Sequence, residues 1–277
     1  MDKNKDIVQV NIEEIIKNKS KRLYNLLPRF VLNKIRKIIH EDEVNDILLR
    51  YHGQNGVDFA NGLMKEFNVH FDIHHQERIP KDGKLIVASN HPLGGFDGLA
   101  LISLISQYRK NIKFPVNDFL MNIPNLQDIF IPINKVGNNS TALARWFAEI
   151  FNSENTILYF PAGICSRKID GKIQDIAWKK TFVAKAKEYQ RDILPVYFSG
   201  KNSDFFYNLS YFRKKIGIKA NIEMAYLADE FFNQRNCSYT VYIGNPVSCS
   251  SLFSEKPDYT IAQEIRDYVY TLQNEEK

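Results

Sequence analysis

Apolar residues recur at three- and four-residue spacing through residues 7–50, a pattern typical of amphipathic helices. Pro28 lies inside this run and is expected to break or kink the helix, because proline cannot donate the backbone hydrogen bond that a helix needs. Basic side chains fill positions between the apolar ones, so one side of the helix is predicted to be apolar and the other strongly positive. These basic residues are Lys17, Lys19, Lys21, Arg22, Arg29, Lys34, Arg36 and Lys37.

After a further helical stretch at residues 56–67, short apolar runs typical of strands alternate with helical patterns. Residues 69–74 alternate strictly, and more continuous apolar runs follow at residues 85–89, 130–133, 156–160, 193–198 and 239–243. The helical patterns lie at residues 98–108, 141–151, 179–189 and 260–272. Strands that alternate with helices predict an α/β fold, with a mostly parallel central sheet flanked by helices and an N-terminal helical extension. We divide the chain into an N-terminal helical region, residues 1–67, and an α/β domain, residues 68–277.

Composition places the chain among ordinary globular proteins. It has 277 residues, of which 44% are hydrophobic and 25% charged, so a sizeable core can form. No stretch approaches the roughly 18 consecutive apolar residues of a membrane-spanning helix, and the best candidate, residues 99–105, is far too short. The first residues carry acids and lack the apolar stretch of a secretory signal, so we expect a cytoplasmic protein. Cys165, Cys237 and Cys249 lack CxxC spacing and are expected to be reduced thiols.

The positive charge of the chain is concentrated near its N-terminus. The net charge is +5, a mild bias that matters only where it is clustered. A basic amphipathic helix suits the anionic surface of a membrane. The same pattern suits a helix that packs on the main domain with a solvated basic face, and the sequence leaves both interpretations open.

The most informative segment is residues 89–98, Ser-Asn-His-Pro-Leu-Gly-Gly-Phe-Asp-Gly, where a predicted buried strand ends and a helix begins. Ligands favour this edge of an α/β sheet. His91 and Asp97 can meet on such a tight loop, with the carboxylate holding one imidazole nitrogen while the other takes a proton. They are therefore candidates for a general base and its partner. A structural histidine at a capped helix start is the alternative, whereas a dinucleotide site is disfavoured because the glycines lack GxGxxG spacing.

A second loop follows another predicted buried strand, at residues 160–168, Phe-Pro-Ala-Gly-Ile-Cys-Ser-Arg-Lys. Proline and glycine shape a turn there, and two cations lie beside a hydroxyl group. This arrangement can hold an anionic group, which makes Arg167 and Lys168 binding candidates. The alternative is that both are merely solvated charges.

The two loops resemble motifs I and III of the glycerolipid (lysophospholipid) acyltransferase family, which has Asn-His, four residues and an Asp, and later Phe-Pro-Glu-Gly-Thr-Arg-Ser. Asn90, His91 and Asp97 match the first motif with one additional residue, which a Gly-Gly pair can accommodate. Residues 130–135 resemble the family's middle motif, and residues 194–196 resemble its late Val-Pro-Val strand. Four motifs in the correct order, over roughly residues 70–250, make the resemblance fairly specific.

The resemblance implies a site built from these motifs. It assigns catalysis to His91 and Asp97. Substrate binding is expected from Asn90, Gly94, Gly95, Lys135 (where the family normally has Arg), Phe160, Pro161, Gly163, Ser166, Arg167 and Lys168.

The departures from the family pattern bear on the acceptor. The form His-Pro-Leu-Gly-Gly-Phe-Asp-Gly resembles that of a bacterial branch of acyltransferases related to amino-acid-lipid synthesis. Ala162 and Cys165 stand where the family has a Glu and an Arg, to which head-group recognition is attributed in phosphatidate-forming members. A lyso-glycine or lyso-ornithine lipid therefore becomes an alternative to lysophosphatidate as the acceptor.

The function implied by the resemblance is a peripheral membrane acyltransferase on the inner face of the membrane. His91 would deprotonate the acceptor hydroxyl, which attacks the thioester of acyl-CoA or acyl-carrier protein, without a metal, a cofactor or a covalent enzyme intermediate. Expected partners are this donor, a lyso-lipid in the bilayer and an anionic membrane surface, with no nucleic acid. The rival functions are a catalytically weak lipid-binding module on the same fold, an N-acyltransferase acting on an amino-acid head group, and a metal-dependent hydrolase that uses His91 and Asp97 as ligands.

A separate metal site is a further alternative. Strand alternation would put His70, Asp72 and His74 on one face, where they could ligate a metal. The polar, solvent-facing side of an edge strand is the commoner outcome of such a pattern.

Overall fold

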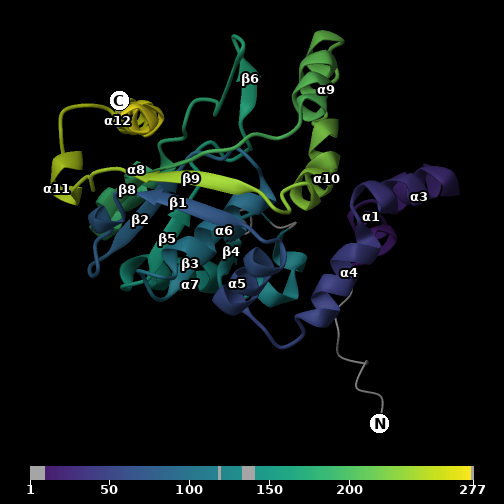
Figure 1. Ribbon diagram of the computed structural model, residues 1–277, viewed down its shortest axis with the longest axis horizontal. Coiled ribbons are helices and arrows are strands. Elements are labelled where there is room, and N and C mark those ends of the chain that lie inside the picture. Colours follow the sequence, from purple (N-terminus) through teal and green to yellow (C-terminus); the bar gives the residue numbers. More distant parts are fainter. Residues whose placement is uncertain (1–9, 118–119, 133–140, 276–277) are drawn as a thin grey trace.

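The computed structural model describes residues 10–117, 120–132 and 141–275. Its centre is a seven-stranded sheet in the order β1-β9-β8-β2-β5-β3-β4 (Figure 1). The strands are β1 His70–His74, β2 Leu85–Ser89, β3 Ile112–Val116, β4 Phe130–Pro132, β5 Thr156–Tyr159, β8 Asp192–Phe198 and β9 Ser238–Ile243. Strands β8, β2, β5, β3 and β4 are parallel, whereas β9 runs antiparallel to β8 and parallel to β1. The predicted α/β fold with a mostly parallel sheet is confirmed.

Helices cover both faces of the sheet. Helices α5 (Gly56–Glu66) and α6 (Gly95–Ile105) pack in one core with Leu85 and Val87 of β2. Helices α7 (Thr141–Asn152), α8 (Thr181–Tyr189) and α12 (Asp258–Thr271) pack in a second core with Ile86 and Ala88 of the same strand. All of β2 is buried, which explains why its sequence is a continuous apolar run.

The N-terminal residues form short helices: α1 Ile12–Lys19, α2 Lys21–Leu26, α3 Arg29–Ile38 and α4 Glu41–Arg50. The predicted break at Pro28 is confirmed, since this residue precedes α3 as its N-cap. A further break lies at Ser20, whose side chain caps α2 by accepting a hydrogen bond from Leu23 N. Among the described residues, no helix has the length and apolar character needed to cross a bilayer. The division of the chain at residue 67 stays a prediction.

Several elements were not predicted from the sequence. Strand β3 contains a proline at position 115, which weakens its strand pattern. The hairpin of β6 (Arg167–Ile169) and β7 (Lys172–Gln174) rises from the same side of the sheet as α9 (Asp204–Lys215), which contacts β6 (Figure 1). The remaining elements are α10 Leu227–Phe232, α11 Cys249–Leu252, and the 3-10 helices η1 Gln76–Arg78, η2 Leu120–Asn122, η3 Pro124–Leu126, η4 Ile222–Tyr226 and η5 Leu272–Asn274.

Candidate active site

His91 and Asp97 form a hydrogen-bonded pair where β2 passes into α6. His91 follows the strand closely, and Asp97 lies in the first turn of the helix. The His91 Nδ1 and Asp97 Oδ1 atoms are 2.9 Å apart. The other carboxylate oxygen of Asp97 accepts a hydrogen bond from Leu93 N at 2.8 Å, and the whole side chain is buried. Asp97 is therefore fixed in position, and it orients the imidazole ring.

The turn between β2 and α6 depends on Gly94. Its backbone has φ 77° and ψ −123°, a conformation that only glycine adopts without strain. A Cβ atom added there would lie 2.9 Å from Leu227 Cδ2. A Cβ atom on Gly95 would meet nothing within 4 Å, so open space lies beside the start of α6.

The surroundings of His91 tune its basicity. The ring stacks on Phe160, with centroids 4.0 Å apart and planes 16° apart, and the side chain is 16% exposed. Burial lowers the pKa of His91, but Asp97, aided by Asp175, outweighs that effect and holds the pKa above the ordinary value. Within the part of the chain that the structure describes, no group hydrogen-bonds to Nε2 of His91. This nitrogen is the one available to take a proton from a substrate.

Asn90 ties the loop to the neighbouring strand. Its Nδ2 donates to Phe198 O at 2.9 Å, and its Oδ1 accepts from Phe198 N at 2.7 Å. The predicted substrate-binding residue is thus buried and engaged with the end of β8. The position of the His91 loop is fixed relative to two strands.

Asp175 joins the two loops, and sequence reasoning missed it. Its carboxylate accepts hydrogen bonds from His91 N at 3.2 Å, Ser166 Oγ at 2.6 Å and Trp178 Nε1 at 2.9 Å. Ser166 N also donates to His91 O at 2.7 Å. Burial raises the pKa of Asp175, while hydrogen bonds from Ser166 and Trp178 oppose that rise. A lone aspartate in Gln-Asp-Ile-Ala-Trp belongs to no motif, so the sequence offered no signal for this role.

The second loop is mostly buried. The buried residues are Pro161, Ala162, Cys165, Ser166 and Arg167, whereas Gly163 and Lys168 are exposed. Burial raises the pKa of the Cys165 thiol to about 11, so this group stays protonated at neutral pH. Gly163 has φ 71° and closes the turn after Phe160, to whose carbonyl its N–H donates.

Arg167 is engaged inside the protein. Its Nη2 lies 3.2 Å from Glu223 Oε1, and its Nη1 donates to Cys165 O at 2.8 Å. Glu223 also accepts from Arg213 Nε at 2.7 Å. The two candidate cations are therefore separated, with Arg167 in a buried network and Lys168 exposed on β6. Lys135 lies outside the described residues.

The residues considered as an alternative metal site, His70, Asp72 and His74, lie on β1. His74 Nε2 lies 3.2 Å from Asp72 Oδ2, and the His74 ring stacks on Tyr242 with centroids 4.7 Å apart. Over residues 10–117, 120–132 and 141–275, no three His, Cys, Asp or Glu side chains gather closely enough to hold a metal ion.

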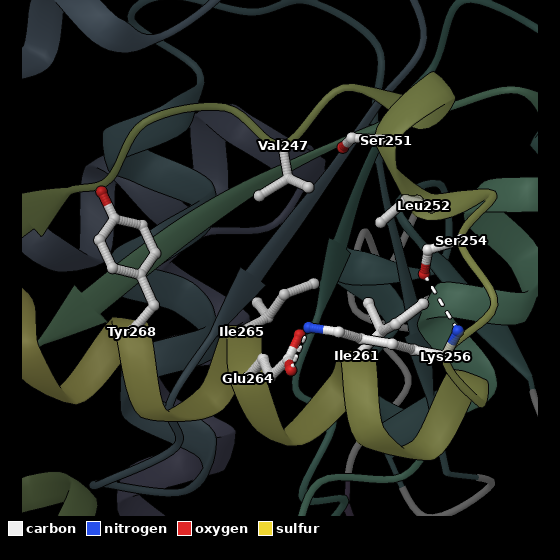
Figure 2. Close-up of a pocket in the computed structure, with 9 residues that line it drawn as sticks. All are labelled: Val247, Ser251, Leu252, Ser254, Lys256, Ile261, Glu264, Ile265 and Tyr268. Atoms are coloured by element: carbon white, nitrogen blue, oxygen red, sulfur yellow. Dashed lines mark hydrogen bonds and ion pairs between the residues drawn. The ribbon is translucent and has the colours of Figure 1, made fainter.

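A separate pocket of about 330 Å³ lies between α12 and the segment that includes α11 (Figure 2). Ile261, Ile265 and Tyr268 of α12 face Val247 and Leu252 across it, and no lining residue comes from either motif loop. The pocket is thus distinct from the His91–Asp97 pair.

Comparison with known proteins shows the family of the chain. A family model described as Acyltransferase matches residues 14–276. The chain is 42% identical over 267 residues to a lyso-glycine lipid O-acyltransferase of Phocaeicola vulgatus, covering 96% of each protein. It is 39% identical over 264 residues to a protein of the same name from Bacteroides thetaiotaomicron, covering 95% of this chain and 97% of that relative.

A solved structure, the 1-acyl-sn-glycerophosphate (LPA) acyltransferase PlsC from Thermotoga maritima, matches with a TM-score of 0.46 and 19% identity, over 88% of this chain and 92% of that one. The family match and the two bacterial relatives both extend over nearly the whole chain. This protein is an acyltransferase, and it belongs to the family that its two loops resemble.

Proposed function

We propose that this enzyme transfers a fatty acyl group from acyl-CoA or acyl-carrier protein to the hydroxyl group of a lyso-glycine lipid. The observation that supports the proposal is the hydrogen-bonded His91–Asp97 pair, in a chain 42% identical to a protein named for that reaction. The names of both relatives specify O-acylation, which favours a hydroxyl acceptor over the amine of an amino-acid head group.

In the proposed mechanism, Nε2 of His91 removes the proton from the acceptor hydroxyl as its oxygen attacks the thioester carbonyl. Asp97 stabilises the imidazolium that forms, through the hydrogen bond at Nδ1. Collapse of the tetrahedral intermediate breaks the carbon–sulfur bond, and the proton returns from His91 to the departing thiolate. The acyl ester and the free thiol are the products. This scheme draws on no metal or cofactor, because the His–Asp pair itself supplies the base.

The second loop supports an acceptor other than lysophosphatidate. Ala162 and Cys165 stand at the positions of the family's Glu and Arg, and both are buried. Arg167, the nearest cation in sequence, is held by Glu223 and not directed to solvent. A phosphate monoester would therefore lack the partners at these positions that it has in phosphatidate-forming members.

The N-terminal helices support docking on the cytoplasmic face of an anionic membrane. Leu26 and Phe30 are 78% and 73% exposed, beside exposed Lys21, Arg22 and Arg29. A basic residue near an anionic surface contributes about 1 kcal/mol to binding, so several such residues give reversible attachment. The lyso-lipid acceptor lies in the bilayer, which is why the enzyme needs such a surface.

A competition assay tests the function. The purified enzyme receives acyl-CoA or acyl-carrier protein with lyso-glycine lipid and lysophosphatidate at equal concentrations, and the diacyl products are separated by mass. We expect mainly the glycine lipid, and loss of at least about a hundredfold in the His91→Ala variant. The exposed His52→Ala variant is the matched control. Preference for lysophosphatidate would refute the proposed acceptor. A His91→Ala rate within about threefold of wild type would refute the proposed mechanism.

A further inference from the structure

Helix α9 and the chain after it expose large apolar side chains to solvent. The helix buries Phe206, Tyr207, Ser210 and Arg213 on one side. Its other side and the following residues expose Phe205, Tyr211, Phe212, Ile216, Ile218 and Ile222. Exposed apolar patches of this kind mark contacts with a partner or a membrane. We call residues 211–222 the α9 tip.

The α9 tip is also positively charged. Lys214, Lys215 and Lys219 are exposed and flank Ile216 and Ile218. The sequence has no acidic residue from 205 to 222, and the carboxylate that follows at Glu223 is buried. Lysines beside exposed apolar groups match a bilayer interface, where phosphate groups lie beside acyl chains. An acidic protein surface would match the lysines, but it would leave the apolar side chains without a complementary partner.

Buried hydrogen bonds hold the α9 tip in place. Arg213 donates to Ile218 O at 2.9 Å and to the Glu223 carboxylate at 2.7 Å. Glu223 in turn accepts a hydrogen bond from Arg167. The residue before Arg167 is Ser166, whose N–H donates to the backbone oxygen of His91. The tip and the catalytic loop are thus attached to one buried network.

The tip lies near the other candidate docking element. Helix α9 extends away from the sheet, on the side where α3 also lies (Figure 1). Helix α3, which carries exposed Phe30, contacts η4, and η4 begins at Ile222 at the end of the tip. Helix α3 therefore lies next to the end of the tip.

We infer that the α9 tip is a second membrane-docking element, which inserts its apolar side chains into an anionic bilayer while its lysines contact the lipid phosphates. The inference rests on the proposed function in that the acceptor is a bilayer lipid. Docking through the tip sets the distance and orientation of the His91 loop relative to the membrane surface, because both belong to one buried network.

Two triple variants test the inference in vesicle sedimentation, with equal parts of phosphatidylglycerol and phosphatidylcholine. One variant replaces Phe212, Ile216 and Ile218 by Ser, and the other replaces Lys214, Lys215 and Lys219 by Gln. We expect binding to weaken on the order of tenfold or more in the first variant and, at low salt, on the order of a hundredfold in the second. Only the second effect should shrink as salt is raised, since salt screens charge and not apolar burial.

Matched controls carry equivalent changes elsewhere. Phe253, 66% exposed near α11, is replaced by Ser. Exposed Lys65, Lys81 and Lys110 are replaced together by Gln, which removes the same charge. These controls should bind the vesicles as wild type does. Equal weakening in the lysine control would mean that total charge, and not the α9 tip, governs binding, which would overturn the inference.

Insertion itself is measured with brominated lipids, which quench a tryptophan that enters the bilayer. The Phe212→Trp variant should be quenched beyond the wild-type background, and the Phe253→Trp variant should not. Absence of extra quenching at position 212, or vesicle binding by the apolar variant equal to wild type, would refute the inference. If that variant binds vesicles normally but loses turnover only with acyl-carrier protein as donor, the tip is a carrier-protein site and the membrane assignment is wrong.

A water-soluble, short-chain lyso-glycine acceptor separates this inference from the proposed function. Tip variants should use it at the wild-type rate, while turnover of bilayer-embedded acceptor falls. Failure of the wild-type enzyme to acylate either acceptor would refute the proposed function, whatever the vesicles show. Normal turnover with unchanged vesicle binding in the variants would refute the docking inference alone.

Discussion

The Asp97→Asn variant tests the central pair of the site most directly. Asp97 accepts two hydrogen bonds, from His91 Nδ1 at 2.9 Å and from Leu93 N at 2.8 Å, one on each oxygen. Asparagine has the same size but only one oxygen, so its NH₂ group must face one of these two nitrogens. If its oxygen keeps the bond to the Leu93 amide, the NH₂ group points at the imidazole. His91 then carries its proton on Nε2, and that nitrogen can no longer act as a base.

The expected loss follows from this change of tautomer. Positioned acid–base groups contribute typically 100- to 10,000-fold to a rate, and a histidine held in the wrong tautomer forfeits that contribution. At about 1.36 kcal/mol for each factor of ten, this corresponds to about 2.7–5.4 kcal/mol of transition-state stabilisation. Stability should change less, because a buried carboxylate is replaced by a neutral group of equal volume.

The assay is the pH dependence of acyl transfer at saturating donor. His91 must be neutral to act as a base, so the wild-type rate should rise with pH through a pKa above the ordinary histidine value. Removing the carboxylate lowers the pKa of His91, so the residual activity of Asp97→Asn should reach its plateau at lower pH. The wild-type and variant proteins are compared by thermal unfolding at each pH to exclude loss of fold.

The raised pKa of His91 also makes the stability of the folded protein depend on pH. Because the folded pKa of His91 lies above its unfolded value, the protonated ring stabilises the fold fully below the unfolded pKa, about 6.5. That stabilisation is lost as the pH rises through the folded pKa. Asp97→Asn should lack most of this dependence. A variant rate within about threefold of wild type, or a rate profile displaced to higher pH, would refute the reasoning.

Three further predictions concern the residues that support the site. Gly94→Ala should lower the free energy of unfolding by about 1–3 kcal/mol through backbone strain. Gly95→Ala, whose new methyl group meets open space, should leave that free energy nearly unchanged. Equal chemical denaturation midpoints for the two variants would contradict this prediction. Glu223→Gln should cost about 3–5 kcal/mol because it leaves two arginines buried without their carboxylate, while Glu264→Gln in an exposed ion pair should cost about 0–1 kcal/mol, both measured by urea unfolding. Asp175→Asn should lower kcat on the order of tenfold to a hundredfold by loosening the catalytic loop, and should displace the rate profile to lower pH; a change in KM alone would argue against this positioning role.

Much of the sheet could be predicted because its signals are local. Strand β2 coincides with the predicted run at residues 85–89, since a strand buried on both faces needs consecutive apolar residues. Strand β3 was missed because a proline and a lysine interrupt its short apolar pattern. Helix α9 was missed because both of its sides carry aromatic residues, so no single apolar stripe marks it.

The residues of the candidate site also differ in how well the sequence predicted them. His91 and Asp97 were identified because their loop follows a recognisable strand and they are only six positions apart in the sequence. Asp175 was not, because it lies 84 residues from His91 and belongs to no motif. Arg167 was identified as a cation beside the site, but its partner Glu223 lies 56 residues away, and nothing in the sequence links the two.

The sequence by itself determined the α/β class, the family and the pairing of His91 with Asp97, because periodicity and motif spacing act over a few residues of chain. Only the tertiary structure decided which N-terminal apolar residues are buried, such as Ile12 and Leu32, and which face solvent, such as Leu26 and Phe30. It also decided that Arg167 lies inside a buried network while neighbouring Lys168 is exposed. Burial depends on which distant segments pack together. An arginine that the sequence alone would place in solvent can be buried when a carboxylate from another element pairs with it.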